Sequence, residues 1–377
     1  MDAAKRVCAE INLNNLKHNI SEIRKILDKN VMIMGVVKAD AYGHGAVEIS
    51  KTLVSNGVQR LAVATVDEAI TLRENNINVP VLVFGSITEE DVHKVFDYDL
   101  TPIIFNVNHG ELISSAAVKY GKNIKVHIKV DTGMGRLGFF PDSYGVKQVV
   151  DVARLPRLEL EGIMTHFSCA DDEKPDYTLL QFTFFMEMCE NLKKQGVEFE
   201  IRHAANSAAT LKYKDMHLNM IRPGLIIYGI YPEHTKEYTS VDLKPVMTLK
   251  SKLVSIKQFP KDSFISYGRA YRISRDHSII GVVSAGYADG YWRALSDKGH
   301  VLIGGKTVPI AGRICMDYFM VDLTDVSDCV YEGQEVILMG KSGSKEITAD
   351  MIGNLCGTIS YEVVCRIGKR VERVYVN

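Results

Sequence analysis

Hydrophobic residues in the first two thirds of the chain fall into short runs separated by longer amphipathic stretches. Eight runs rich in β-branched residues are predicted to be strands: 31–38, 61–64, 79–85, 101–105, 124–131, 158–166, 201–205 and 221–228. Apolar residues recur at helical spacing between them, over 47–55, 66–74, 144–153 and 176–195. A strand followed by a helix, repeated eight times, predicts a (β/α)8 barrel of the TIM type.

The pattern changes after about Lys244. Strand-like runs separated by turns follow, over 246–259, 278–285, 301–303, 307–311, 319–323 and 336–339. We therefore expect an α/β chain with an N-terminal barrel over residues 12–240 and a mainly β C-terminal domain over residues 241–377. The apolar run at the start of the chain precedes the first helix, and we expect residues 1–11 to pair with the C-terminal domain.

Composition narrows the class of protein. Hydrophobic residues make up 46% and charged residues 24% of the chain, and no apolar run approaches the roughly 20 residues that span a bilayer. The formal net charge of −1 argues against nucleic acid or a membrane as partner and favours a small-molecule substrate. Seven cysteines without a C-x-x-C pair indicate a reducing, cytoplasmic compartment, and no metal site is expected.

Polar residues end or follow several predicted barrel strands, and one more lies near the start of the last strand. The active sites of such barrels lie at the carboxyl ends of the strands, so these side chains are expected to share one rim. They are Lys38, Arg136, His166, Asn206, Ser207 and Arg222. Each one alone is more often a surface or structural residue, but their common placement favours a functional site.

Two of these positions indicate a phosphorylated cofactor. Lys38 follows Val36 and Val37, so its amine emerges from an apolar strand, where the neutral nucleophilic form needed for Schiff-base chemistry is favoured. Ser207 precedes a predicted helix and Gly224 permits close backbone approach, which suits a phosphate group. The glycines over 133–138 have the G-x-G-x-x-G spacing, but the sequence FFP at 139–141 interrupts the helix that a dinucleotide site needs.

The chain also resembles a known family over nearly its whole length. VVKADAYGHG at 36–45 resembles the cofactor-lysine signature of the alanine racemases, which are pyridoxal 5'-phosphate (PLP) enzymes of fold type III. Further matches follow in the family's order: KVDTGMGRLG at 129–138, THF at 165–167, ANS at 205–207, RPG at 222–224, SYG at 266–268, GYADG at 286–290, GRICMD at 312–317 and YE at 361–362.

The resemblance implies roles for the cofactor site. Lys38 would hold PLP, Arg222 would face its ring nitrogen, and His166 would pack near the ring. An arginine is not a proton donor near neutrality, so the ring nitrogen would stay unprotonated and the cofactor would withdraw electrons more weakly. The other implied cofactor contacts, mainly around the phosphate, are Tyr42, Asn206, Ser207, Gly224, Leu225 and Tyr361.

Racemisation needs two acid/base groups on opposite faces of the substrate α-carbon. The resemblance assigns Lys38 and Tyr267 to these roles, with Tyr267 supplied by the partner subunit of a homodimer. Arg136 and Met316 would contact the substrate carboxylate. Lys129 matches a position that is often carbamylated, where the added negative charge would orient Arg136.

The resemblance also implies an entrance corridor and a biological role. Tyr287 and Arg293 would line the entrance to the site. The expected reaction interconverts L-alanine and D-alanine and supplies a D-amino acid for cell-wall peptidoglycan.

Alternatives remain open at this point. A serine racemase module of a glycopeptide-resistance system has nearly the same motifs, and the chain would then be the cytoplasmic domain of a longer, membrane-anchored protein. Tyr361 distinguishes the two, because its bulk limits the pocket to a methyl side chain. A PLP-dependent decarboxylase of the same barrel type would be expected to place a carboxylate at the ring nitrogen, and a non-catalytic PLP carrier would not need the C-terminal domain.

Overall fold

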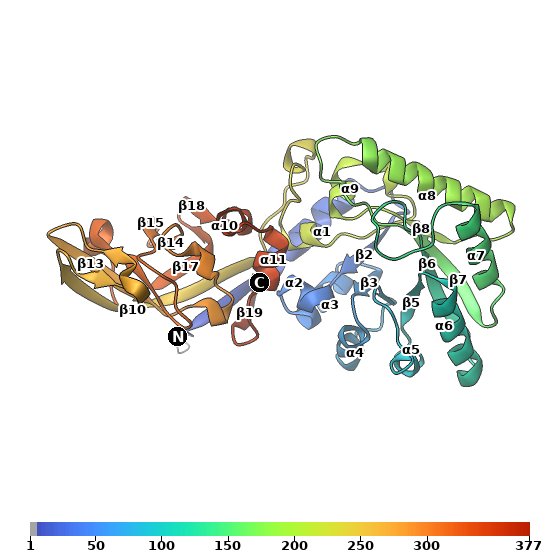
Figure 1. Cartoon of the computed structure of the whole chain (residues 1–377), viewed down its shortest axis with the longest axis horizontal. Helices are drawn as coiled ribbons and strands as arrows, with labels where there is room; N and C mark the ends of the chain where they lie inside the picture. Colours follow the sequence, from blue (N-terminus) through green and yellow to red (C-terminus); the bar gives the residue numbers. More distant parts are fainter. Residues whose placement is uncertain (1–5) are drawn as a thin grey trace. The chain divides into compact units, whose positions relative to one another are not determined.

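The computed structural model describes residues 6–377, so residues 1–5 of the segment expected to pair with the C-terminal domain lie outside it. The chain forms two compact units. The barrel unit comprises Leu16–Ala41 and Ala46–Lys244, and the C-terminal unit comprises residues up to Asn15, the short segment Tyr42–Gly45, and Pro245–Asn377 (Figure 1).

Eight parallel strands form the sheet of the barrel unit, in the order β8-β7-β6-β5-β4-β3-β2-β9. The sequences of these strands are continuous apolar runs, as expected for strands that are buried on both faces. Their bounds are β2 (Met32–Val36), β3 (Arg60–Val63), β4 (Val81–Val83), β5 (Thr101–Ile104), β6 (Ile124–Lys129), β7 (Leu158–Met164), β8 (Ile201–His203) and β9 (Met220–Ile221).

Backbone hydrogen bonds bring the two end strands of this sheet together. The amide of Asn219 donates to the carbonyl of Arg202 at 3.1 Å. The amide of Arg222 donates to the carbonyl of Ala205 at 2.9 Å. The predicted eight-stranded barrel is therefore confirmed as a nearly closed one. The last predicted strand, 221–228, is wrong in extent: β9 ends at Ile221, because Pro223 has no amide hydrogen to donate, and a 3-10 helix follows at Leu225–Tyr228.

Helices follow the barrel strands along the chain and surround them (Figure 1). Their start signals are local: Thr65, Asn106 and Asp142 each cap the first turn of the helix that follows. The helices are α1 (Leu13–Lys25), α3 (Ala46–Ser55), α4 (Val66–Glu74), α5 (Val92–Asp97), α6 (Val107–Tyr120), α7 (Ser143–Ala153), α8 (Asp176–Lys194) and α9 (Ser207–Lys212).

The C-terminal unit is built around one long strand, β10 (Met247–Pro260). It pairs antiparallel with β1 (Val7–Asn12), β13 (His277–Val283) and β17 (Glu335–Ser342). The first strand thus lies in this sheet, where it also pairs in parallel with β19 (Glu372–Val376).

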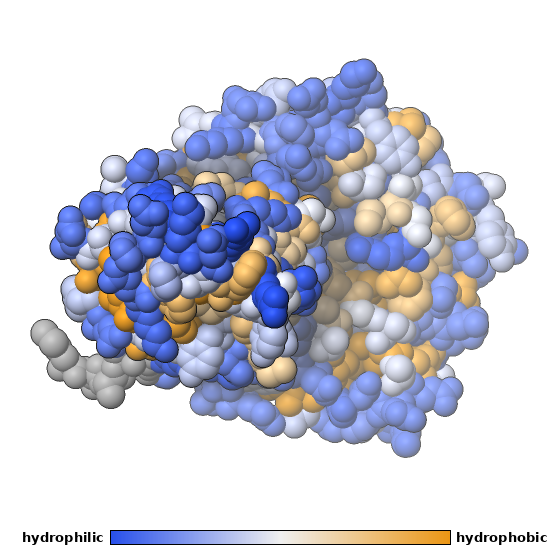
Figure 2. Space-filling model, turned by 60° about the vertical axis from the view of Figure 1, so that its left-hand side comes forward, coloured by the Kyte–Doolittle hydropathy of each residue, from blue (hydrophilic) through white to orange (hydrophobic). Residues whose placement is uncertain are grey.

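Shorter strands and two helices complete this unit. The strands are β11 (Phe264–Ile265), β12 (Tyr271–Arg272), β14 (His300–Ile303), β15 (Lys306–Pro309), β16 (Phe319–Asp322) and β18 (Lys345–Ile347). The helices α10 (Ala349–Cys356) and α11 (Ser360–Cys365) were not predicted, but strands predominate, so the mainly β assignment is confirmed. Hydrophilic and hydrophobic residues are interspersed over the surface that Figure 2 shows. Within residues 6–377, no helix has the length and apolar character needed to cross a bilayer.

Candidate active site

Lys38 stands at the end of a buried barrel strand, as predicted, and begins an unusual turn. Val37 before it is fully buried, whereas Lys38 is half-buried. The residues Ala39, Asp40 and Ala41 have φ of 53° and ψ of 49° to 50°, so the segment α2 (Lys38–Tyr42) is a left-handed turn. This conformation costs roughly 1–2 kcal/mol per L-residue. Such strain is typical of functional sites held by their surroundings.

Glu68 holds this turn in place. One carboxylate oxygen accepts the amide of Ala39 at 2.6 Å, and the other accepts the amides of Ala64 at 2.8 Å and Thr65 at 3.3 Å. Glu68 was not among the predicted site residues. The T-x-x-E spacing of Thr65 and Glu68, a capping box, was the available signal.

Arg222 is buried at the mouth of the barrel unit, directly after β9. Its two Nη atoms donate to the carbonyls of Thr165 (2.7 Å), His203 (2.8 Å) and Ala204 (3.0 Å), and contact His203 Nδ1 at 3.2 Å. Among the described residues these are all of its hydrogen bonds, so its Nε–H has no protein acceptor. Burial lowers the pKa of Arg222 to about 9, which leaves it charged at neutral pH.

Two other basic groups near Arg222 lose their charge more readily. Burial lowers the pKa of Lys129 to about 7, helped by Arg222, and its Nζ donates to the carbonyl of Val130 at 3.0 Å. Burial and the charges of Arg222 and Lys129 lower the pKa of His166 well below its usual value. His166 is therefore a neutral imidazole at pH 7, in surroundings that favour an anionic ligand.

The glycine-rich loop after β6 is shaped by Asp131. Its carboxylate accepts the amides of Gly133 and Gly135 at 3.0 Å and that of Arg136 at 2.7 Å. Burial alone would raise the pKa of Asp131, but these hydrogen bonds lower it. Both glycines have positive φ, so they serve this loop conformation, and Arg136 lies exposed on it.

Some of the barrel-unit residues predicted to contact the cofactor lie near the start of α9. Ser207 opens that helix, and its Oγ accepts the amide of Gly224 at 2.9 Å. The side chain of Asn206 is engaged as the helix cap, since it accepts the amide of Ala209 at 3.0 Å. Leu225 is fully buried directly after Gly224.

Within the C-terminal unit, the structure brings Tyr42 and Tyr361 together. Their ring centroids lie 6.1 Å apart. Tyr42 is buried, and burial, followed by the influence of Tyr361, raises its pKa above the usual value. The hydroxyl of Tyr42 is therefore a protonated hydrogen-bond donor at neutral pH.

Four loops of the C-terminal unit, here called the linked loops, carry the remaining predicted residues: Tyr267, Tyr287, Arg293 and Met316. The loops comprise residues 266–269, 286–290, 293–296 and 313–317. Hydrogen bonds join them, among them Arg313 N to Ser266 Oγ (2.9 Å), Tyr287 N to Cys315 O (3.0 Å), Ala288 N to Met316 O (3.1 Å) and Ile314 N to Ser296 Oγ (3.0 Å). The side chain of Tyr267 is 70% exposed.

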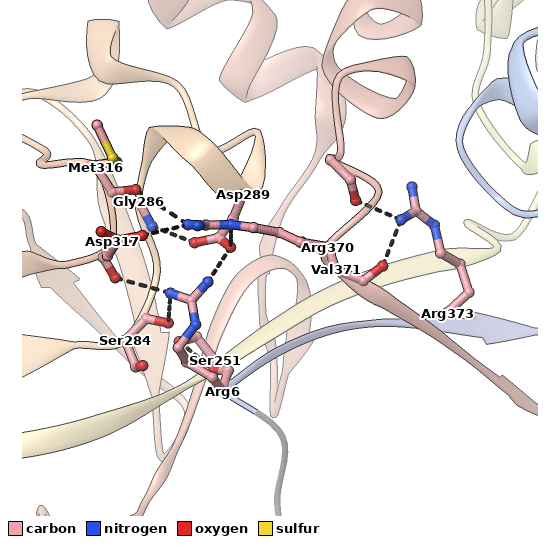
Figure 3. Close-up of polar contacts among 11 residues, drawn as sticks. Arg6, Ser251, Ser284, Gly286, Asp289, Met316, Asp317, Arg370, Val371 and Arg373 are labelled. Carbon is pink, nitrogen blue, oxygen red and sulfur yellow. Dashed lines mark hydrogen bonds and ion pairs between the residues drawn. The ribbon is translucent and has the colours of Figure 1, made fainter.

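A buried carboxylate, Asp289, fastens two of the linked loops (Figure 3). It accepts the Nε–H of Arg370 at 2.7 Å, the amide of Gly286 at 2.9 Å and a hydrogen bond from Arg6. Arg370 also donates to Asp317 at 2.8 Å. Asp289 lies within the GYADG motif but was assigned no role from the sequence. The only signal there was an acidic residue in a segment bounded by glycines.

Comparison with known proteins decides the family. The alanine racemase N-terminal domain model matches residues 11–232, and the C-terminal domain model matches residues 246–375. The alanine racemase of Clostridium tetani is 44% identical over 371 residues, which cover 98% of this chain and 95% of that protein. The chain belongs to the alanine racemase family. It is thus an isomerase, and the predicted amino-acid racemase class is confirmed.

Solved alanine racemases agree in fold. The enzyme from Clostridium difficile 630 superimposes with a TM-score of 0.94 at 39% identity, covering all of this chain and 97% of that one. The Bacillus anthracis alanine racemase with bound L-Ala-P gives a TM-score of 0.92 at 35% identity, covering all of this chain and 96% of that one.

Proposed function

We propose that this member of the alanine racemase family binds PLP, with Lys38 holding the aldehyde of the cofactor, and interconverts L-alanine and D-alanine. When bound, PLP withdraws electrons from the α-carbon of an amino acid and so makes its α-proton acidic. The protein then has to hold the cofactor, position the substrate, and move a proton to and from each face.

The single observation that carries this proposal is the buried Arg222. Its Nε–H has no acceptor among the described residues, while its Nη atoms are fixed by three carbonyl groups. An unprotonated ring nitrogen fits this donor, because arginine offers hydrogens and accepts none. A decarboxylase would be expected to have a carboxylate here, so Arg222 favours racemisation.

The phosphate of the cofactor would lie among donors that stay neutral. The Ser207 hydroxyl, which accepts the amide of Gly224, and the backbone amide of Leu225 would donate to the phosphate, with Asn206 fixing the helix start. The Tyr42 hydroxyl, whose pKa is raised by burial, would donate to the phosphate, and Tyr361 would stand beside it.

Proton transfer would use Lys38 on one face of the α-carbon and Tyr267 of the partner subunit on the other. His166 supports the second role, because a neutral imidazole can accept a hydrogen bond from a tyrosine hydroxyl and so favour its loss of a proton. The exposure of Tyr267 suits a residue that acts in a neighbouring subunit of a homodimer.

The substrate carboxylate would be held by Arg136 and Met316. A carbamylated Lys129 would orient Arg136 by its negative charge. The pKa of about 7 for Lys129 supports this modification, since only the neutral amine reacts with carbon dioxide. Tyr287 and Arg293 would line the entrance.

Alanine is favoured over serine as substrate. The relatives described above are alanine racemases, and one structure holds L-Ala-P. In this proposal the bulk of Tyr361 restricts the pocket to a methyl group, although an added hydroxyl is typically rejected by only about 10²-fold in an apolar pocket. The D-alanine formed would serve peptidoglycan synthesis.

Racemisation of L-alanine and L-serine should be measured side by side by chiral chromatography, with the visible absorbance of the same sample. We expect bound cofactor and much faster alanine turnover. Comparable or faster serine turnover would refute the substrate assignment, and bound cofactor without any turnover would refute racemisation. Lys38→Ala should lose the absorbance band, whereas Tyr267→Phe should keep the band and lose racemisation.

A further inference from the structure

A line of buried hydrogen bonds runs through the barrel unit away from Arg222. Its Nη1 contacts Nδ1 of His203 at 3.2 Å, Nε2 of His203 contacts Nδ1 of His127 at 2.8 Å, and Nε2 of His127 contacts Glu161 at 3.0 Å. Both histidines are completely buried. The proposed function gives no role to His203, His127 or Glu161.

The two ends of this line fix the position of every proton in it. Arginine can only donate, and an ionised carboxylate can only accept. His203 therefore accepts from Arg222 at Nδ1 and donates from Nε2, and His127 accepts at Nδ1 and donates from Nε2 to Glu161. Burial lowers the pKa of both histidines, so both are neutral, as this arrangement requires.

Glu161 is held in its ionised form at the far end of the line. Arg60 binds both of its carboxylate oxygens, at 2.6 and 2.9 Å, and Lys125 binds one at 2.9 Å. Burial alone would raise the pKa of Glu161, but hydrogen bonds from His127, Arg60 and Lys125 lower it. The acceptor end therefore stays an acceptor at neutral pH.

The backbone is shaped for this arrangement. The register between β6 and β7 shifts at this point: Val126 pairs with Leu160 and His127 with Gly162, which leaves Glu161 as an extra residue in a bulge. Bulges re-aim side chains and are uncommon between parallel strands. A Cβ on Gly162 would lie 2.4 Å from Nδ1 of His127, so only glycine leaves room for this ring.

We propose that Glu161 is a positioning residue of the active site, acting on Arg222 through His127 and His203. The inference rests on the proposed function, in which Arg222 faces the ring nitrogen of PLP. Glu161 keeps both imidazoles in the tautomer that accepts from Arg222, and so holds the guanidinium with its Nε–H free to donate to the cofactor. A neutral amide in place of Glu161 can donate instead, which permits the opposite tautomers and sets an imidazole N–H against Arg222.

The tautomers can be read directly in the unaltered holoenzyme. We would label histidine with ¹⁵N and assign the signals of His127 and His203 from the variants His127→Asn and His203→Asn. Both rings should be neutral with hydrogen on Nε2. Hydrogen on Nδ1, or a doubly protonated ring, at either position would overturn the proposal even if no Glu161 variant folds.

A matched pair of variants then tests the effect on the cofactor. Glu161→Gln removes the charge, and Glu159→Gln makes the same change at an exposed position of the same strand, β7. For Glu161→Gln we expect a shifted visible band and a kcat lowered about 10-fold with little change in KM, the size of loss seen when the hydrogen-bond partner that orients a metal-binding histidine is removed. A band and a kcat equal to those of Glu159→Gln would refute the role of Glu161.

The failure of the proposed function would look different. Wild-type protein that has the expected tautomers but no visible band would contradict PLP binding, and with it the role of Arg222. A normal band with the opposite tautomers would contradict only the role of Glu161.

Discussion

At the residue scale, burial decides which basic groups keep their charge. The position of Lys38 at the end of a barrel strand could be predicted from the sequence, because the apolar run 31–38 ends there, whereas Arg222 was expected near the start of a strand and instead follows β9. The state of Lys129 could not be predicted, because its pKa of about 7 depends on burial and on the charge of Arg222, which lies 93 residues later in the chain. The hydrogen bonds of Glu161 could not be predicted for the same reason, because its partners lie on other strands.

Lys129 should make the stability of the protein depend on pH. Its folded pKa of about 7 lies below the ordinary value of 10.5, so between these values the unfolded chain binds a proton that the folded protein does not. The free energy of unfolding should therefore rise with pH across this window. Replacing Lys129 by Met should stabilise the protein at pH 7 but bring little gain near pH 10.

This prediction is checked by urea unfolding of both proteins in bicarbonate-free buffer, which keeps the lysine unmodified. Lys119→Met, on an exposed position of α6, is the matched control and should change stability little at either pH. An equal effect of Lys129→Met at pH 7 and pH 10 would contradict the low pKa.

At the element scale, the regular strands could be predicted from the sequence, whereas the local irregularities of the backbone could not. The eight barrel strands follow from apolar periodicity, and so do the helices α3, α4, α7 and α8. The left-handed turn after Lys38 gave no signal, because Ala39, Asp40 and Ala41 favour ordinary helix or loop conformations and Glu68 fixes them from another element. The bulge at Glu161 was equally invisible, because β7 reads as one continuous run.

Glycine should be tolerated in the left-handed turn where it is normally harmful. At Ala39, with φ of 53°, glycine relieves roughly 1–2 kcal/mol of strain, which offsets its entropic cost. We expect Ala39→Gly to leave the free energy of unfolding unchanged or raised. The same change at Ala116 within α6 should lower it by about 1 kcal/mol. Thermal and urea unfolding of the two variants tests this, and an equal loss in both would argue against a strained turn.

Asp289 should control two of the linked loops at once. Asp289→Asn leaves Arg6 and Arg370 without their buried counter-charge, so we expect a loss of about 2–3 kcal/mol in stability. The backbone of Met316 and Tyr287 would loosen, so the KM for alanine should rise. The matched control Asp317→Asn removes only a half-exposed pair with Arg370 and should cost less than about 1 kcal/mol. Urea unfolding and steady-state kinetics would show whether the two variants differ.

At the scale of the whole molecule, the change of pattern near Lys244 predicted a barrel before this point and a mainly β architecture after it. The structure has both. The proposed role of Tyr267 in a partner subunit concerns the assembly of the protein, because neither the apolar pattern nor the fold of a single chain determines it. Tyr267 is 70% exposed within its own chain, and its assignment to the partner subunit comes from the family resemblance. That assignment needs an experiment in which subunits are exchanged.

Mixing two inactive variants provides this experiment. If each site combines Lys38 of one subunit with Tyr267 of the other, a heterodimer of Lys38→Ala and Tyr267→Phe subunits has one site with both groups intact and one with neither. Random re-association makes half of the dimers mixed, so unfolding and refolding the two proteins together should restore about a quarter of the wild-type rate. If both groups came from the same chain, every site in the mixture would lack one of them. Activity no higher than that of the separate variants would therefore place Lys38 and Tyr267 in one subunit, provided that refolded wild-type protein recovers its own rate.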